Sequence, residues 1–164
     1  MTSTVRLRAL EPEDLDLVYQ IENDSALWQW GADCMPYSRY ALRQYIEQQG
    51  IDIYQDGQLR QVIEADGTAV GIADLTSFSP HHRRAEVGIV VISGHQRQGF
   101  ASEALRQLAQ YGKEHLHLNS LYAYVGKGNE PAQALFRSVG YAAVGQLDRW
   151  IEGRETATLY QLML

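Results

Sequence analysis

The sequence of residues 85–108 indicates an apolar strand, a short turn with glycines and an amphipathic helix in direct succession. Residues 85–92 are mostly β-branched, which is typical of a strand in the interior of a sheet. After the turn from Gly94 to Gly99, apolar residues recur at helical spacing as far as Leu108. Such a turn leaves free N–H groups and the positive end of the helix dipole at the helix start. The order therefore predicts an anion site, best suited to phosphate, in an α/β protein.

The rest of the chain supplies further strands and helices for the same core. Helices are expected after Glu11, after Ser38 and after Asn129, where capping or first-turn residues stand. Residues 22–33 are expected to form a loop. Strands are expected over residues 5–9, 61–65, 69–76, 85–92, 121–125, 141–152 and 155–164, with a type I′ hairpin at Asp66-Gly67. The pattern predicts an α/β fold, of the α+β kind, whose mixed sheet has helices on both faces.

Length and composition restrict the class of protein. A chain of 164 residues, 45% hydrophobic and 21% charged, suits a single soluble domain over residues 1–164. No stretch approaches the ~18 apolar residues of a membrane helix, and no signal peptide is recognised. A lone cysteine, Cys34, fits a reducing compartment, so a cytoplasmic location is expected. The net charge of −6 argues against a nucleic-acid partner and favours a small cationic substrate.

Several ordered motifs together carry a resemblance to a known family. They are Gln96-x-x-Gly99-x-Ala101 after the strand, residues 82–86 (HRRAE), residues 6–15, and Asn129-x-x-Ala132-x-x-Leu135-Phe136-x-x-x-Gly140-Tyr141. The chain resembles the GNAT (GCN5-related) N-acetyltransferases, and most closely their bacterial spermidine/diamine N-acetyltransferase branch. The resemblance implies a mostly antiparallel sheet with a splayed central strand pair. It also implies acetyl-CoA as co-substrate and assembly into a homo-oligomer, a dimer or larger.

The resemblance assigns the coenzyme to the strand, the turn and the later helix. Backbone N–H groups of residues 89–91 would hold the acetyl carbonyl, provided that the strand splays from its neighbour near Gly88. Asn129 would contact the coenzyme, or act only as a helix cap. The expected coenzyme-binding residues are Ile89, Val90, Val91, Gln96, Arg97, Gln98, Gly99, Phe100, Ala101, Ser102, Asn129, Ala132, Phe136 and Arg137.

Acetyl transfer to an amine requires a base, because an amine with a pKa of about 10 is protonated at neutral pH. Glu86 is the candidate base, directly or through water. The alternatives are an ion pair with Arg83 or Arg84, or a carboxylate that only binds substrate. Asp33 and Asp74 are candidate substrate-binding acids, although solvated surface positions account for them nearly as well.

One position departs from the family pattern. In the spermidine branch, the helix after Asn129 carries a tyrosine that protonates the departing thiolate, and Phe136 occupies that position here. Nearby tyrosines, Tyr122, Tyr124 and Tyr141, have no assigned place relative to the sulfur. No metal site is expected. Neither His81-His82 nor His115-x-His117 is accompanied by the cysteine or paired carboxylates that would complete a set of metal ligands.

The predicted activity is transfer of an acetyl group from acetyl-CoA to a primary amine, such as spermidine or another small amine. Two alternatives remain at this point. One is a protein N-terminal acetyltransferase of the ribosomal-protein type. The other is a non-catalytic acetyl-CoA-binding module, which the phenylalanine at position 136 motivates.

Overall fold

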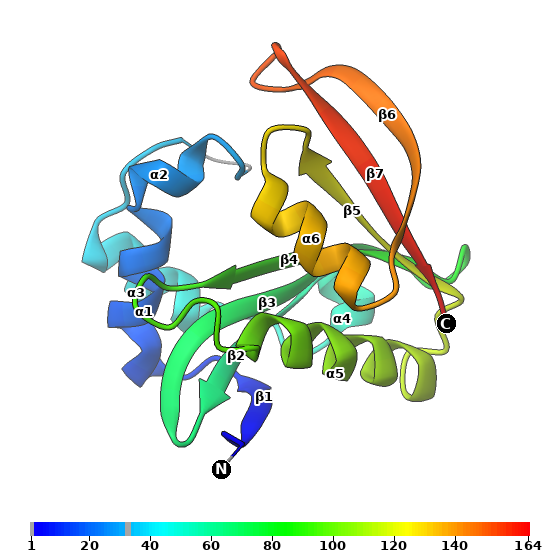
Figure 1. Ribbon diagram of the computed structural model, residues 1–164. Coiled ribbons are helices and arrows are strands. Elements are labelled where there is room, and N and C mark those ends of the chain that lie inside the picture. The colour runs from blue at the N-terminus through cyan, green and yellow to red at the C-terminus, as the bar shows by residue number, and fades with distance from the viewer. Residues whose placement is uncertain (1, 32–33) are drawn as a thin grey trace.

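A computed structural model describes residues 2–31 and 34–164 (Figure 1). Within these residues, seven strands form one sheet in the order β1-β2-β3-β4-β5-β7-β6. The strands are β1 (Val5–Ala9), β2 (Leu59–Ala65), β3 (Thr68–Ser79), β4 (Arg84–Val91), β5 (Ser120–Gly126), β6 (Ala142–Ile151) and β7 (Glu155–Met163). The helices are α1 (Leu15–Glu22), α2 (Ser25–Trp28), α3 (Arg39–Glu47), α4 (Ile53–Asp56), α5 (Phe100–Glu114) and α6 (Glu130–Ser138), with a 3₁₀ turn η1 (Pro12–Asp14).

The first four strands form an antiparallel half-sheet. Asp66 and Gly67 join β2 to β3 with φ angles of 49° and 82°. Because a type I′ turn needs a positive φ at both central residues, the predicted hairpin is confirmed. The three consecutive antiparallel strands β2, β3 and β4 then lead into α5, as the sequence predicts.

The central strands β4 and β5 run parallel for only a short distance. Their register pairs are Arg84 with Ser120, Ala85 with Leu121 and Glu86 with Tyr122. Beyond Glu86, β4 stays paired with β3 while β5 follows β7. The two strands therefore point away from one another in Figure 1, and the predicted splayed pair is confirmed.

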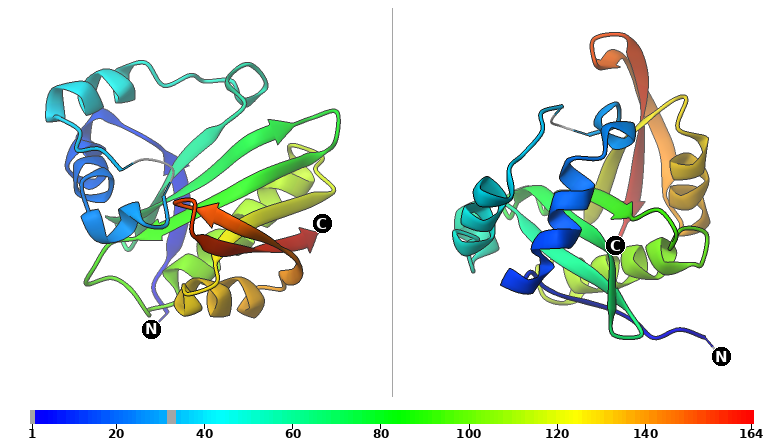
Figure 2. Two further views of the ribbon diagram at one scale, coloured as in Figure 1. Left: turned by 90° about the horizontal axis from the view of Figure 1, so that it is seen from above. Right: turned by 90° about the vertical axis from the view of Figure 1, so that its left-hand side faces the viewer.

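Helices cover both faces of the sheet, each over its own core. On one face, α5 and α6 pack against a large cluster that includes Leu75, Leu105 and Leu121. On the other face, α1 and α3 pack against a smaller cluster around Val18, Leu42 and Ile72. The right-hand view of Figure 2 shows the two groups of helices on opposite sides of the strands. The chain is thus layered as helix, sheet and helix.

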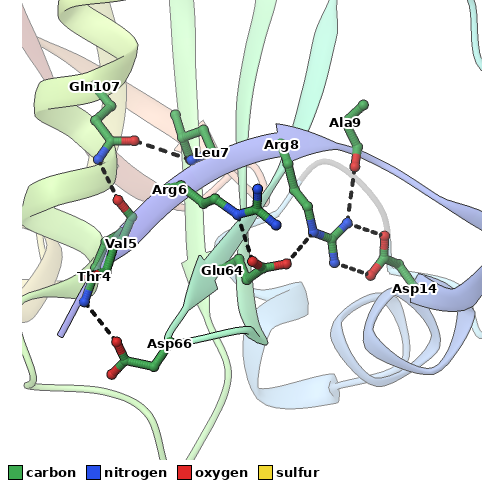
Figure 3. A network of polar contacts seen from close by, with 10 residues as sticks. All are labelled: Thr4, Val5, Arg6, Leu7, Arg8, Ala9, Asp14, Glu64, Asp66 and Gln107. Atoms are coloured by element: carbon green, nitrogen blue, oxygen red, sulfur yellow. Dashed lines mark hydrogen bonds and ion pairs between the residues drawn. The ribbon is translucent and has the colours of Figure 1, made fainter.

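Polar contacts fix the first strand to its neighbours (Figure 3). Arg8 donates to both carboxylate oxygens of Asp14 at 2.8 Å and to Glu64 at 2.6 Å. The Gln107 side chain of α5 accepts from the Leu7 amide and donates to the Val5 carbonyl. These contacts tie β1 to the start of α1, to β2 and to α5, which gives the edge strand defined neighbours.

The expectation of a loop over residues 22–33 is partly wrong. Ser25–Trp28 forms the single helical turn α2, whose first turn is capped by the Asp24 side chain accepting from the Ala26 amide at 3.0 Å. An aspartate at this place satisfies an otherwise free N–H group, so a short turn forms without a long apolar repeat. The Ser38 cap of α3 is as predicted, since its hydroxyl accepts from the Ala41 amide.

Candidate active site

The turn between β4 and α5 has the geometry that an anion needs. Gly94, Arg97 and Gly99 all have positive φ angles, of 90°, 61° and 84°. Gly99 is the N-cap of α5, and a Cβ there would meet no atom within 4 Å. The backbone conformation, and not a lack of space, is therefore what favours glycine at this position.

The first turn of α5 presents donors without partners. The first helical hydrogen bond runs from the Glu103 amide to the Gly99 carbonyl at 3.1 Å. Within the described ranges, the N–H groups of Phe100, Ala101 and Ser102 donate to no other group. Free amides at the positive end of a 15-residue helix are suited to donate hydrogen bonds to a phosphate.

Two residues of this turn that were predicted to bind the coenzyme use their side chains in hydrogen bonds within the protein. The Gln96 side chain donates to the Val91 carbonyl at 3.0 Å, and the Gln98 side chain donates to the Gly94 carbonyl at 3.4 Å. The side-chain amides of both residues therefore stabilise the conformation of the turn. Their side chains support its shape, while its main chain is left to meet a ligand.

Donors also face the gap between β4 and β5. The Ile92 amide donates to Val70 of the neighbouring chain segment at 2.9 Å. Because amides along an antiparallel strand point alternately to the two sides, the N–H group of Val90 also points toward β3. The N–H groups of Ile89 and Val91 then point into the gap. Of residues 89–91, Ile89 and Val91 are therefore the ones whose N–H groups face the place expected for the acetyl carbonyl, while the N–H group of Val90 faces β3.

The gap opens into a cavity of about 720 Å³. It reaches from α6 and β5, past β4, to the segment of α1, α2 and α3. Predicted site residues that line it are Asp74, Glu86, Ile89, Val90, Asn129, Ala132 and Phe136. Val91 and Gln96 line a separate hollow of about 30 Å³. The other predicted coenzyme residues, Arg97, Gln98, Gly99, Phe100, Ala101, Ser102 and Arg137, do not line the cavity. Asp33 lies outside the described residues.

Glu86 stands where the two central strands separate and lines the cavity. Burial raises the pKa of its carboxyl above the ordinary value, and a hydrogen bond with the Ser77 hydroxyl opposes part of that rise. No ion pair of Glu86 with Arg83 or Arg84 is found in the described part of the chain, so that alternative is wrong. A half-buried carboxylate without a cationic partner is suited to accept a proton.

Asp74 also lines the cavity, but its carboxylate is engaged. The Arg60 guanidinium donates to both Asp74 oxygens, at 2.9 and 3.0 Å, and to Glu22 at 2.9 Å. Burial raises the pKa of Asp74, and the charge of Arg60 counteracts part of the rise. The three side chains together carry one net negative charge, so a substrate amine would share Asp74 with Arg60.

Helix α6 closes the opposite end of the cavity. The Asn129 side chain caps it by accepting from the Ala132 amide at 3.3 Å. Phe136 lines the cavity and is buried, and it packs edge-on against Tyr141 with 5.0 Å between ring centroids. The Arg137 guanidinium lies over the Tyr160 ring at 5.7 Å. The face of α6 at the cavity therefore offers apolar contact and no hydroxyl.

Arg60, Ser77 and Tyr124 lie at the site without having been assigned a role from the sequence. Arg60 shares the inward face of β2 with Val62, and a charged residue at such a position indicates a buried partner. Ser77 has a φ of 47° in an irregular part of β3, which no sequence pattern marks. Tyr124 lines the cavity from β5, directly beside the gap.

Metal ligands and membrane segments were also sought. Residues 2–31 and 34–164 contain no group of three histidine, cysteine, aspartate or glutamate side chains arranged to hold a metal ion. None of the helices described is long and apolar enough to span a bilayer.

Comparisons with known proteins agree with this geometry. A family model described as an acetyltransferase (GNAT) domain matches residues 4–142. The spermidine N(1)-acetyltransferase of Escherichia coli (strain K12) is 32% identical over 144 residues, covering 88% of this chain and 76% of that protein.

Solved structures are similar over nearly the whole chain. The spermidine N-acetyltransferase from Vibrio cholerae in complex with CoA and spermine superposes with a TM-score of 0.85 at 25% identity, over 97% of this chain and 95% of that one. A dodecameric structure of the Vibrio cholerae spermidine N-acetyltransferase in an intermediate state has a TM-score of 0.78 at 26% identity, over 97% and 93%.

The chain belongs to the GNAT acetyltransferase family. The predicted fold, the resemblance to the spermidine N-acetyltransferase branch, and the class of acetyl-CoA-dependent N-acetyltransferase are confirmed. The individual site residues remain predictions.

Proposed function

We propose that the protein transfers an acetyl group from acetyl-CoA directly to a small primary amine, with a polyamine such as spermidine as the acceptor. The observation that carries this proposal is the order of free backbone amides along the chain from β4 to α5. Glu86 lines the cavity at the point where β4 leaves β5, the β4 edge beyond it is unpaired, and free amides follow at the start of α5. A nucleotide thioester has the same order of parts, with the diphosphate at one end and the reactive carbonyl at the other.

In this proposal the diphosphate binds the amides of Phe100, Ala101 and Ser102. The pantetheine arm pairs with the free edge of β4 as an additional strand, which is a form of β-augmentation. The thioester carbonyl accepts a hydrogen bond from the N–H group of Ile89 or Val91. These donors stabilise the negative charge that develops on the carbonyl oxygen when the amine attacks.

Glu86 removes the proton from the amine, directly or through a water molecule. Its burial supports this role, because a raised pKa makes the carboxylate a stronger base than an exposed glutamate. The amine nitrogen then attacks the carbonyl carbon, and the carbon–sulfur bond breaks. Each step takes place where β4 has left β5 and its amides are free.

The acceptor side of the cavity is suited to a cation. The Arg60, Asp74 and Glu22 group carries one net negative charge, and Glu86 adds another when it is ionised. Trp28 and Trp30 line the same side, and aromatic faces attract ammonium groups. The relatives from Escherichia coli and Vibrio cholerae are spermidine N-acetyltransferases, which supports a polyamine as the acceptor.

The proposal extends to the protein as a whole. Residues 1–164 form one acetyltransferase domain that works in the cytoplasm as a homo-oligomer. Support for the oligomer comes from the dodecameric Vibrio cholerae relative. Sedimentation of the purified chain would test it, and a monomer at micromolar concentration would contradict it.

Release of free thiol from acetyl-CoA is the test of function. The purified chain is mixed with spermidine, spermine, putrescine, amino acids and N-terminal peptides in parallel reactions. We expect release with the polyamines, and mass spectrometry should show one added acetyl group on the amine. Release only with peptides would support the protein N-terminal alternative. Binding of acetyl-CoA without release from any amine would support the non-catalytic module.

A further inference from the structure

The proposed reaction leaves the departing sulfur without a proton donor. Phe136 occupies the α6 position at the cavity and has no hydroxyl. Tyr141, which packs against it, does not line the cavity, and burial raises the pKa of its phenol well above the ordinary value. Tyr160 is fully buried, and its hydroxyl donates to the Gln133 side chain at 3.0 Å. None of these three side chains is placed to protonate the thiolate.

Three tyrosines line the cavity within the described residues, and they differ in position. Tyr37 and Tyr45 come from the segment that covers the acceptor side, and Tyr45 lies against Arg60. Tyr124 comes from β5, the strand that forms one wall of the gap. Only Tyr124 therefore stands on an element next to the place proposed for the thioester.

The register of the central strands defines where Tyr124 lies relative to β4. Glu86 pairs with Tyr122, and this is the last pair before β4 and β5 separate. Two residues further along each strand, Gly88 and Tyr124 stand opposite one another across the gap. Because side chains alternate with a period of two, Tyr124 is on the same face of the sheet as Glu86.

The space in front of Tyr124 is open. Gly88 has no side chain, and a Cβ built there would meet its nearest neighbour, Asp74, at an ordinary 3.6 Å. The Tyr124 ring is held by Tyr122, edge-on at 5.8 Å, and by Trp150 at 5.5 Å. No hydrogen bond to its hydroxyl is found between residues 2–31 and 34–164, so the proton is available to a ligand.

We propose that Tyr124 protonates the thiolate of coenzyme A as it leaves, taking the part for which Phe136 lacks a hydroxyl; this rests on the proposed acetyl transfer. When the carbon–sulfur bond breaks, its electron pair goes to sulfur, and the Tyr124 hydroxyl gives its proton to that sulfur. The products are the N-acetylated amine and free coenzyme A. The nitrogen, which is positively charged after its attack, gives a second proton to water as the amide forms. The phenolate regains a proton from water, and Glu86 releases to water the proton that it took from the ammonium group.

The experiment compares wild type with Tyr124→Phe, which removes only the hydroxyl. We expect kcat for thiol release to fall about 100-fold, which is the lower end of the range for general acid catalysis. The KM for acetyl-CoA and the calorimetric Kd for coenzyme A should change less than about twofold, since the ring remains.

Two further variants separate a proton donor from a packing role. Tyr54→Phe removes a hydroxyl that lies away from the cavity, against Phe78, and should retain wild-type kcat. Phe136→Tyr in the Tyr124→Phe background should restore part of the lost kcat, because it returns a hydroxyl to the cavity from α6.

Other results would overturn the assignment. A kcat of Tyr124→Phe within about twofold of wild type would do so, as would a fall explained by weaker coenzyme binding. A wild-type chain that binds acetyl-CoA but acetylates no amine would instead refute the proposed function, and this assignment with it.

Discussion

Arg60 and Asp74 stand directly opposite one another on β2 and β3 and form a two-pronged ion pair inside the acceptor side of the cavity. Glu22 of α1 binds the same guanidinium. Arg60 thus neutralises acids that would otherwise repel one another where little water reaches them. A cation at this position allows acidic residues to line the site while the sheet stays folded.

Replacing Arg60 by glutamine should destabilise the protein in a pH-dependent way. At neutral pH we expect a loss of about 3 kcal/mol, as for other buried ion pairs that lose one partner. Burial already raises the pKa of Asp74, and loss of Arg60 would raise it further. An ionised carboxylate with a raised folded-state pKa destabilises the fold, so the deficit should shrink as the pH falls through that pKa.

Urea unfolding at pH 7.5 and pH 5 would measure this effect. Arg43→Gln is the matched control, since Arg43 is an exposed arginine on α3. We expect the control to stay within about 0.5 kcal/mol of wild type. An Arg60→Gln deficit that is equal at both pH values would contradict the explanation.

Glu86→Gln should lower kcat and flatten the acidic side of the pH–rate profile, because the amide cannot accept a proton. In wild type, the rate should fall as the pH drops through the pKa of Glu86, which burial holds above its ordinary value. Ser77→Ala should move that fall to higher pH, since the hydrogen bond with Ser77 lowers the pKa. Steady-state rates from pH 5 to pH 9 would measure both changes.

Loss of substrate binding alone would give another pattern. If Glu86 only binds the amine, Glu86→Gln should raise KM for the amine and leave kcat and its acidic limb intact. Near-normal kcat in that variant would refute the role of base.

Gly71→Ala should weaken the sheet beside the gap. A Cβ at position 71 would lie 2.2 Å from the Val90 carbonyl oxygen and 3.0 Å from the Val91 Cα, and both atoms belong to the backbone of β4. Because backbone cannot rotate away as a side chain can, we expect a loss of about 2 kcal/mol or more. Gly145→Ala on β6 is the control, since a Cβ there meets nothing within 4 Å. Equal melting temperatures for the two variants would contradict this prediction.

Asp14→Asn should destabilise the connection between β1 and α1. Burial alone would raise the pKa of Asp14, but the hydrogen bonds from Arg8 hold it below the ordinary value. A carboxyl whose pKa is lower in the folded state stabilises the fold at pH values above its unfolded-state pKa of about 3.9. This stability is lost as the pH falls through the folded-state pKa. We expect a loss of about 3 kcal/mol at pH 7.

The same comparison at pH 3 gives the test of that explanation. The difference between Asp14→Asn and wild type should be smaller there, because wild type has begun to lose the contribution. Asp16→Asn removes an exposed partner of Arg39 and should cost less than about 0.5 kcal/mol at either pH. A constant difference for Asp14→Asn would show that its charge is not the cause.

The elements of the fold follow largely from local patterns in the sequence. Asp66-Gly67 and Ser38 act through their immediate neighbours, so their turn and cap could be predicted. The splay of β4 from β5 was expected from the family resemblance. The glycine in β4 does not by itself explain the splay, because the register with β3 continues through Gly88 without a bulge. The short helix α2 was missed because a single capped turn has no periodic pattern.

The site was less predictable because its contacts join distant segments. Arg60 meets Glu22 across 38 residues of sequence, and no spacing indicates that pair. The direction of the Val90 amide depends on which edge of β4 faces β3, which follows from the register and not from composition. Tyr124 gains its position opposite Gly88 only from the parallel pairing of two strands.

A structure determined with acetyl-CoA bound would test the central claim most directly. We predict the diphosphate on the amides of Phe100, Ala101 and Ser102, and the thioester between β4 and β5 beside Gly88. Its carbonyl oxygen should accept from the Ile89 or Val91 amide. A coenzyme bound with its diphosphate elsewhere, or with its thioester outside the gap, would contradict the account.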